Sequence, residues 1–480
     1  MNDRKGFGSN FGFLMAAVGS AVGLGNIWGF PNKMGANGGF PFLILYLALA
    51  LCCGVIIMLG ELALGRKTGH GAVGAYQSIS KRFKWLGWLG IAAAALIFSF
   101  YSALGGYCLR YVVVNFGNLI GAEFGTNGVG GADVFQGLLS QPDVSIAFAL
   151  AFMLITMLVV MSGVGGGIER VCSVGMPALF FILIICIIRS CTLPGAVDGL
   201  KYMFVPGWAV ANGIIDEAPG FWRVLTAAGG QMFFSLSLGA GVMITYGSYL
   251  DKKQDLGKSA MIIVGMDTVV ALMAGLCVIP GRFALDPNGA LGGPELLFIT
   301  MQNVFDKMGP AGPVFGILFY LLVFFAAISS SISLLEVIVA HFCDKAREKG
   351  KGDRRKLYSA IAVVICAALC ALVCADGMGS NHISPAELLG LAGAKLPGWS
   401  TSWLGLFDSV AEGLLMPLGA LLMCLMISWE LKPDALRQEI LLNGENRPWV
   451  YDFFRLCVKY ITPLCMLMIL YGQISDFFIA

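Results

Sequence analysis

Hydroxyl side chains that could bind a small cation gather in one apolar segment. Ser329, Ser330, Ser331 and Ser333 follow one another in a run that is apolar on both sides. A hard cation such as sodium prefers oxygen ligands, and neutral hydroxyls and carbonyls supply them without a cage of carboxylates. The alternative is that these hydroxyls donate back to carbonyls of their own helix, which is common in membrane helices.

A carboxylate lies inside a second apolar run, at Asp267. A charged side chain at the centre of a membrane helix costs at least about 2.5–3.5 kcal/mol, so such acids usually mark functional sites. Glu61 is similar but lies nearer the end of its own apolar run. We expect Glu61 to have a structural role, in which it accepts hydrogen bonds from the freed backbone of an interrupted helix.

The first segment that must position these groups is interrupted by glycines. Residues 18–26 read Val-Gly-Ser-Ala-Val-Gly-Leu-Gly-Asn within an apolar run. Each glycine destabilises a helix interior by roughly 1 kcal/mol relative to alanine. Broken backbone is tolerated in hydrocarbon only where it is buried in protein or lines a polar cavity, so we expect the helix to open and free the carbonyls of Gly19 and Val22. The alternative is close helix packing through small residues.

A second interruption lies in the sixth apolar run, where residues 233–241 read Phe-Phe-Ser-Leu-Ser-Leu-Gly-Ala-Gly. Paired interruptions at corresponding positions are typical of transporters built from inverted repeats. We therefore expect an all-α polytopic membrane protein with a 5+5 inverted repeat and broken helices 1 and 6. The expected divisions are a first repeat at 1–190, a second at 191–430 with outer loops at 283–311 and 375–405, and an eleventh helix with the tail at 431–480.

The composition excludes a soluble protein. Of the 480 residues, 58% are hydrophobic and only 12% are charged, which is more apolar surface than a soluble fold can bury. Nearly uncharged runs of about 20 residues recur along the chain and predict about eleven transmembrane helices. They lie near 11–36, 40–65, 86–116, 144–163, 168–190, 222–249, 257–281, 312–343, 357–374, 406–430 and 449–475.

The loop charges predict the orientation. Basic residues cluster in alternate loops such as 66–84 and 345–356, whereas 117–144 contains no Lys or Arg. Because basic loops face the cytoplasm, the N-terminus is expected inside and the C-terminus outside the cell membrane, the inner membrane of a bacterium. The expected partners are the lipid bilayer and a small molecule but no nucleic acid, and the oligomeric state is left open.

The sequence contains no catalytic constellation, so we do not expect an enzyme. No nucleophile–base pair, metal cluster or cofactor motif occurs, and His70, His341 and His382 are scattered. The 14 cysteines lie mostly in apolar runs and predict neither a disulfide nor a metal site.

Taken together, these residues resemble the neurotransmitter:sodium symporter family. The resemblance covers nearly the whole chain and implies a bacterial amino-acid transporter with the fold of the bacterial leucine transporter. It rests on motifs that occur in the family's order: 19–26, Phe30-Pro31, 37–39, Gly60-Glu61, Gly65-Arg66, 100–102, 167–170, 233–241, 244–246 and 329–331.

The resemblance implies two sodium sites. The first would use the Ala21 carbonyl, Asn26, Ser235, Asp267 and the carboxylate of the substrate. The second would use a set of carbonyls and hydroxyls from two helices: Gly19, Val22, Ala326, Ser329 and Ser330.

The resemblance also implies a substrate site between spans one, three, six and eight. A carboxylate would meet backbone N–H groups at a half-helix end together with Tyr101, and Phe234 would close the site as an aromatic lid. The residues implied are Ser20, Ala21, Gly23, Leu24, Gly25, Ile97, Tyr101, Phe234, Ser235, Ser237, Ala240, Ser330 and Leu334.

Gates are implied on both sides. At the inner face Arg4 and Asp344 would form a latch near Tyr249, and at the outer face Phe234 and Asp408 would take part. The family usually has Arg where this chain has Gly29, so the outer latch lacks its cation. Lys33 is a candidate replacement, and closure by water and Phe234 alone is the alternative.

Two positions bear on the solute and the ions. Amine-transporting relatives have Asp at the position of Gly23, which favours an amino acid here, and the small Ala240 favours a hydrophobic or aromatic one. Asp267 occupies a position where chloride-dependent relatives have Asn, so we expect no chloride requirement. The alternatives are another small amine or osmolyte as the solute, or a sensor or channel that does not accumulate it.

Overall fold

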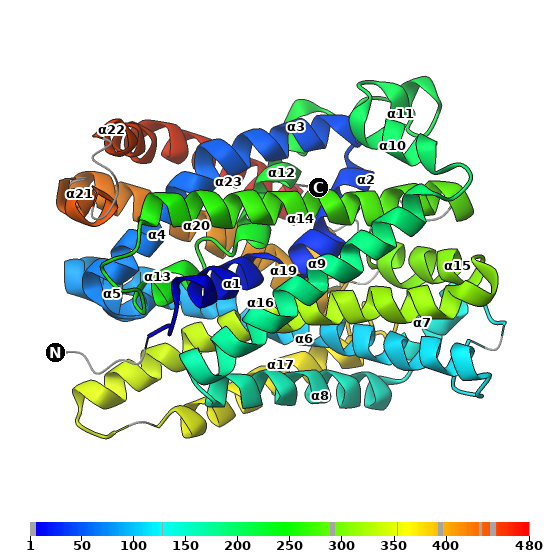
Figure 1. Cartoon of the computed structure of the whole chain (residues 1–480), viewed down its shortest axis with the longest axis horizontal. Coiled ribbons are helices and arrows are strands. Elements are labelled where there is room, and N and C mark those ends of the chain that lie inside the picture. The colour runs from blue at the N-terminus through cyan, green and yellow to red at the C-terminus, as the bar shows by residue number, and fades with distance from the viewer. Residues whose placement is uncertain are drawn as a thin grey trace.

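The computed structural model describes residues 6–126, 128–288, 293–352, 354–391, 397–431, 434–441 and 448–479, and these residues form helices and loops without a strand. Long helices run side by side along the longest axis of the molecule, and shorter helices cover both ends (Figure 1). The all-α architecture expected from the sequence is confirmed.

The spans agree with the predicted number. Nine helices in the described part are long and apolar enough to cross a membrane, and α1 (Asn10–Ala21) with Gly25–Ala36 forms a further span bent by 43°. α12 (Phe221–Leu236) and α13 (Val242–Gly247) form the remaining, interrupted span. The nine are Phe40–Thr68, Lys81–Ile120, Pro142–Met161, Val164–Cys191, Leu256–Leu285, Gly309–Glu348, Arg355–Asp376, Trp403–Leu431 and Trp449–Phe477.

Several of these spans contain more than one helical element. The long α-helices are α3 (Phe40–Leu49), α4 (Val55–Thr68), α6 (Lys84–Ile120), α8 (Pro142–Met161), α9 (Arg170–Cys191), α14 (Leu256–Leu285), α16 (Gly312–Glu348), α17 (Arg355–Asp376), α20 (Met416–Leu425) and α23 (Thr462–Ile479). The short ones are α2 (Phe30–Ala36), α5 (Ala72–Ile79), α7 (Gly131–Leu139), α10 (Ala196–Phe204), α11 (Trp208–Ala211), α15 (Met301–Asp306), α18 (Pro385–Leu388), α19 (Trp403–Asp408), α21 (Asp434–Leu441) and α22 (Pro448–Leu456).

The first span is broken where the glycines predicted it. α1 ends at Ala21, and Val22 is extended with φ −74° and ψ 100°. A π-helical turn, Gly25–Gly29, then leads into α2. The carbonyls before the break are thus released from the helical ladder.

The second span is broken at the predicted segment as well. Ser237, Gly239 and Gly241 have positive φ values of 53°, 79° and 74°, a conformation that the two glycines adopt without strain. The freed Gly239 N–H donates to Glu61 Oε1 at 2.7 Å. The structural role predicted for Glu61 is therefore confirmed.

Spans differ in how deeply they lie in the bundle. The most apolar stretch of Lys81–Ile120 is 78% buried, whereas that of Val164–Cys191 is 28% buried and that of Pro142–Met161 is 33% buried. α6 packs along α16, and α16 also packs against α1. A helix that remains this exposed and apolar is suited to face lipid.

Candidate functional site

Asp267 joins both broken helices. Asn26 Nδ2 donates to Asp267 Oδ1 at 2.8 Å, and Ser235 Oγ lies 3.0 Å from each carboxylate oxygen. The Tyr46 hydroxyl donates to Oδ2 at 3.2 Å, and the Gly23 N–H holds Asn26 by donating to its Oδ1 at 3.0 Å. Asp267 is fully buried and makes no ion pair with Lys or Arg among the described residues, so its charge is available to a bound cation.

A second cluster of oxygens lies where α16 faces the end of α1. Ser329 Oγ lies 3.3 Å from the Val22 carbonyl oxygen and 3.0 Å from that of Ala326. Ser330 Oγ lies 3.4 Å from the carbonyl oxygen of Gly19 and 3.0 Å from that of Ser20. The five residues predicted for the second sodium site are therefore brought together.

The other two serines of the run, Ser331 and Ser333, donate to carbonyls of their own helix, which was the alternative role expected for these hydroxyls. Ser331 Oγ donates to the Ile328 carbonyl at 2.9 Å, and Ser333 Oγ donates to the Ser330 carbonyl at 2.7 Å. Both hydroxyls therefore donate their own proton within α16. Among the four serines, Ser329 and Ser330 place their hydroxyls beside carbonyls of the interrupted helix, whereas Ser333 Oγ accepts a hydrogen bond from the Ser20 hydroxyl of that helix at 2.7 Å.

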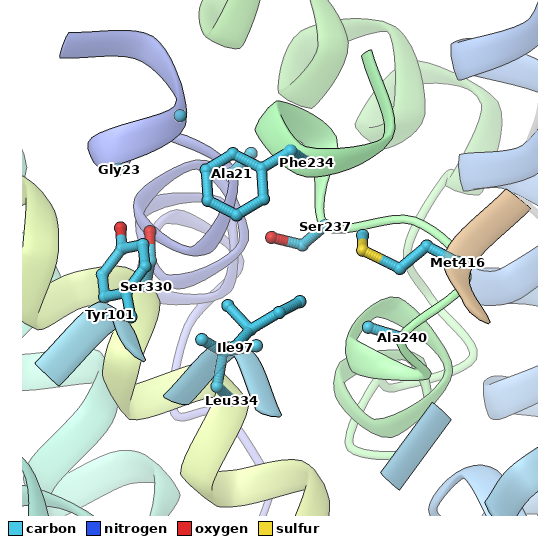
Figure 2. Close-up of a pocket in the computed structure, with 11 residues that line it drawn as sticks. Ala21, Gly23, Ile97, Tyr101, Phe234, Ser237, Ala240, Ser330, Leu334 and Met416 are labelled. Atoms are coloured by element: carbon cyan, nitrogen blue, oxygen red, sulfur yellow. The ribbon is translucent and has the colours of Figure 1, made fainter. Parts of the chain in front are cut away.

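A cavity with about 320 Å³ of empty space lies between the broken helices, α6 and α16. Figure 2 shows its two ends: the hydroxyls of Tyr101 and Ser330 lie beside Gly23, and Ala240 and Met416 lie at the opposite end. Its lining consists of Ala21, Gly23, Gly25, Ile97, Tyr101, Phe234, Ser237, Ala240, Ser330, Leu334 and Met416.

The polar end is organised by one tyrosine. The Leu24 N–H donates to the Tyr101 hydroxyl at 2.7 Å, so that hydroxyl keeps its own proton to donate elsewhere. Phe234 lies across the cavity with its ring centroid 6.3 Å from that of Tyr101. This end therefore offers hydrogen-bond donors to an anionic group, and the opposite end offers only apolar surface.

Three of the thirteen residues predicted for the substrate site, Ser20, Leu24 and Ser235, do not line the cavity but hydrogen-bond to other residues of the site. The Ser20 hydroxyl donates to Ser333 at 2.7 Å, and its carbonyl accepts from Ser237 Oγ at 3.1 Å. Leu24 acts through the N–H that positions Tyr101, and Ser235 is engaged with Asp267. The other ten line the cavity directly.

Three residues of the site were not predicted from the sequence. Tyr46 binds Asp267, and Met416 closes the apolar end of the cavity. Gln231 Nε2 donates to the Gly25 carbonyl at 2.5 Å, and a Cβ on Gly29 would lie 2.9 Å from its Oε1. One tyrosine or one glutamine in an apolar run is weak evidence for a binding site, because either side chain can hydrogen-bond to the backbone of its own helix.

Comparison with known proteins decides the family. Residues 4–127 and 132–478 match the profile of the Sodium:neurotransmitter symporter family. The chain belongs to this family. It is therefore a sodium-dependent multi-pass membrane transporter of a small molecule and not an enzyme.

Individual relatives of the symporter support this assignment. An uncharacterized sodium-dependent transporter of Bacillus subtilis, YhdH, is 36% identical over 477 residues, which cover 97% of both chains. The sodium-dependent nutrient amino acid transporter 1 of Drosophila grimshawi is 27% identical over 409 residues, covering 72% of this chain and 62% of the relative. The crystal structure of MhsT in complex with L-phenylalanine matches with a TM-score of 0.83 at 34% identity, covering 98% of this chain and all of that one.

At one end of the bundle of the symporter, Lys33 forms an ion pair with Glu412, one turn beyond Asp408. The pair lines a cavity with about 690 Å³ of empty space, which Asp408, Arg223 and Asp476 also line. Gln231 fills the space beside Gly29. Lys33, one helical turn beyond Gly29, thus pairs with Glu412 and not with Asp408, the acid predicted for the outer gate.

This ion pair makes a testable prediction. Replacing Lys33 with Gln leaves Glu412 beside Asp408 without its cation, so the initial rate of sodium-driven uptake should fall about tenfold, equivalent to about 1.4 kcal/mol. The charge-swapped pair Lys33→Glu with Glu412→Lys should recover most of the rate. Lys307→Gln, which removes an ion pair with Asp286 in which the lysine is more exposed than Lys33, is the control and should have no effect. Equal losses in both single variants would contradict a gating role.

At the end of the bundle that carries the basic loops, a buried cluster surrounds Glu336. The Tyr249 hydroxyl donates to Glu336 Oε1 at 2.5 Å, and Arg355 donates to Oε2 at 2.5 Å and to Oε1 at 3.1 Å. The Phe7 ring packs edge-on against those of Tyr246 and Tyr249. The sequence did not predict that Arg355, from the next span, supplies the cation.

The predicted inner latch is only partly within the described structure. Asp344 Oδ2 accepts from the Gly71 N–H at 3.0 Å, and its Oδ1 lies 3.7 Å from the Arg347 guanidinium. Arg4 lies outside the described residues, so its pairing with Asp344 stays a prediction.

Proposed function

We propose that this symporter imports an amino acid with a large apolar or aromatic side chain, driven by the inward sodium gradient. The observation that carries the proposal is the two-ended cavity beside Asp267. The Tyr101 hydroxyl, beside Gly23, suits a carboxylate, and Ile97, Leu334 and Met416 suit an apolar side chain. The phenylalanine in the MhsT structure and the amino-acid substrate named for the Drosophila relative favour the same class.

Sodium is assigned to the two oxygen clusters. The first ion would be held by the Ala21 carbonyl, Asn26, Ser235 and Asp267 together with the substrate carboxylate. The second would be held by the carbonyls of Gly19, Val22 and Ala326 with the hydroxyls of Ser329 and Ser330. Because the first ion and the substrate share a ligand set, each raises the affinity of the other, which is the basis of coupling.

In alternating access, the path from the substrate site to one side of the membrane closes while the path to the other side opens. The Lys33–Glu412 pair closes the outer side, and the cluster of Glu336, Tyr249 and Arg355 closes the inner side. We place the outer side at the end of the bundle opposite the basic loops, in the cell membrane, with the N-terminus in the cytoplasm. The repeats that move against each other would be 1–190 and 191–430.

Transport is expected to be independent of chloride. Asp267 supplies a fixed negative charge at the first sodium cluster, so no mobile anion is needed to balance the ion. Replacing chloride with gluconate at constant sodium should leave the initial rate of amino-acid uptake unchanged. A large loss of rate in gluconate would contradict this assignment of Asp267.

The function is tested by uptake into proteoliposomes. Purified protein should accumulate a labelled aromatic or branched amino acid above equilibrium when an inward sodium gradient is present and should stop when the gradient is collapsed. Counterflow without a gradient would persist, since exchange needs no net driving force. Equilibration without accumulation under a sodium gradient would instead identify a channel or sensor.

A further inference from the structure

A separate cavity with about 720 Å³ of empty space lies between α6, the following loop, α7 and the start of α8. It is at the end of the bundle that carries no basic loop, away from the central site. One cationic and one anionic residue line it, Arg110 and Asp133. The rest of the wall is mixed: Tyr111, Thr126 and Gln141 bring polar groups, and the apolar side chains are Val114, Val129, Val134, Leu138 and Val144.

Arg110 lies at a depth where a charge is costly. Its guanidinium lies 5.9 Å from the ring centroid of Phe148, which stands six residues inside α8 and therefore about 9 Å from the start of that span. α8, which contributes Val144 to the cavity wall, presents Leu150 and Leu154 outward further along, 44% and 49% exposed, as a helix that faces lipid would. Among the described residues Arg110 has no carboxylate partner, and a cation in this position needs an anion or water.

Asp133 supplies the opposite charge without pairing with Arg110. It lies in the first turn of α7 and is exposed at the mouth of the cavity. No ion pair joins it to another residue in the described part of the chain. The cavity therefore presents a cation at depth, a carboxylate nearer the surface, and apolar side chains beside them.

We propose that this cavity binds the headgroup of a zwitterionic phospholipid with a primary ammonium, as in phosphatidylethanolamine. The phosphate would contact Arg110, which forms strong charge-assisted bonds to phosphate oxygens. The ammonium would donate to Asp133, and the glycerol and first acyl carbons would lie on the valines and Leu138. A quaternary ammonium cannot donate such a bond, and phosphatidylglycerol carries no cation, so both should bind more weakly.

The test measures binding of single lipids to delipidated full-length protein by native mass spectrometry. Dioleoyl phosphatidylethanolamine should bind one tight site at least tenfold more strongly than the phosphatidylcholine or phosphatidylglycerol of the same chains. Arg110→Gln should abolish this tight site. Asp133→Asn, a change at an exposed position that leaves the fold intact, should remove the preference over phosphatidylglycerol but keep binding of that anionic lipid.

Arg189→Gln is the matched control. Arg189 also lies in a span with its guanidinium 5.9 Å from a phenylalanine ring, that of Phe315, but the cavity that it lines contains no carboxylate. This variant should keep the tight site. Equal lipid affinities in wild type and Arg110→Gln, or equal losses in Arg110→Gln and Arg189→Gln, would overturn the proposal.

A competition experiment with a soluble compound distinguishes a lipid headgroup from a free zwitterion of the same chemistry. Phosphoethanolamine, which has the headgroup charges and no acyl chains, should compete only at concentrations at least 100-fold above the lipid. Competition at equal concentration, with the same dependence on Arg110 and Asp133, would assign the cavity to a free zwitterion and overturn its assignment to lipid.

Discussion

Asp267→Asn is expected to lower sodium-dependent uptake at least about 100-fold. The amide cannot neutralise a cation, and its NH2 group would face the donors of Asn26, Ser235 and Tyr46 that now point at a carboxylate. Breaking a buried charged network by removing one partner costs about 3–5 kcal/mol, and about 2.8 kcal/mol corresponds to 100-fold. The measurement is the initial rate in proteoliposomes across a sodium titration.

The matched control for this variant is Asp376→Asn. Asp376 is also fully buried, and it accepts from the backbone N–H groups of Gly379 and Trp403 at 3.1 and 2.9 Å. That variant should lower thermal stability while its sodium dependence stays that of the wild type. If Asp267→Asn keeps the wild-type sodium titration, Asp267 is not a ligand of the ion.

Gly23→Ala is expected to weaken substrate binding about 10- to 100-fold. A Cβ at this position would lie 2.2 Å from Ser330 Oγ and 2.4 Å from the Tyr101 hydroxyl. Overpacking of this kind costs about 1–3 kcal/mol, and here it falls on the two groups that form the polar end of the cavity. Binding of a labelled amino acid to purified protein in sodium measures the effect.

Gly175→Ala tests whether the loss is specific to the site. Gly175 lies within α9, where a Cβ would meet nothing within 4 Å, so the substitution should leave affinity unchanged. Wild-type affinity in Gly23→Ala would show that the substrate carboxylate binds elsewhere.

Much of the fold could be predicted because its signals are local. The glycines and serines at 18–26 and 233–241 interrupt long apolar runs, and the structure breaks both helices there. The role of Glu61 could be predicted because a carboxylate in hydrocarbon must find hydrogen-bond donors. Backbone N–H groups become available as donors where a helix is interrupted. The hydroxyls of Ser329 and Ser330 lie beside the first break, where carbonyls of Gly19 and Val22 are released from their helix.

The partners of the site residues could not be predicted, because they come from distant parts of the chain. Tyr46 lies 221 positions from the carboxylate that it binds, and nothing in its own helix marks it. Asp408 and Glu412 lie one turn apart, and the sequence does not show which of them pairs with Lys33. The packing of the helices brings Glu412 to it. Met416 completes the apolar end of the cavity from a helix whose sequence resembles any other buried span.

Thermal unfolding of the purified symporter with each of the 20 amino acids, in sodium and in potassium, tests the central claim most directly. If the broken helices bind sodium and an amino acid together, one or a few large apolar amino acids should raise the unfolding temperature in sodium and leave it unchanged in potassium. Stabilisation of the same size in both salts, or by no amino acid in sodium, would contradict a shared site.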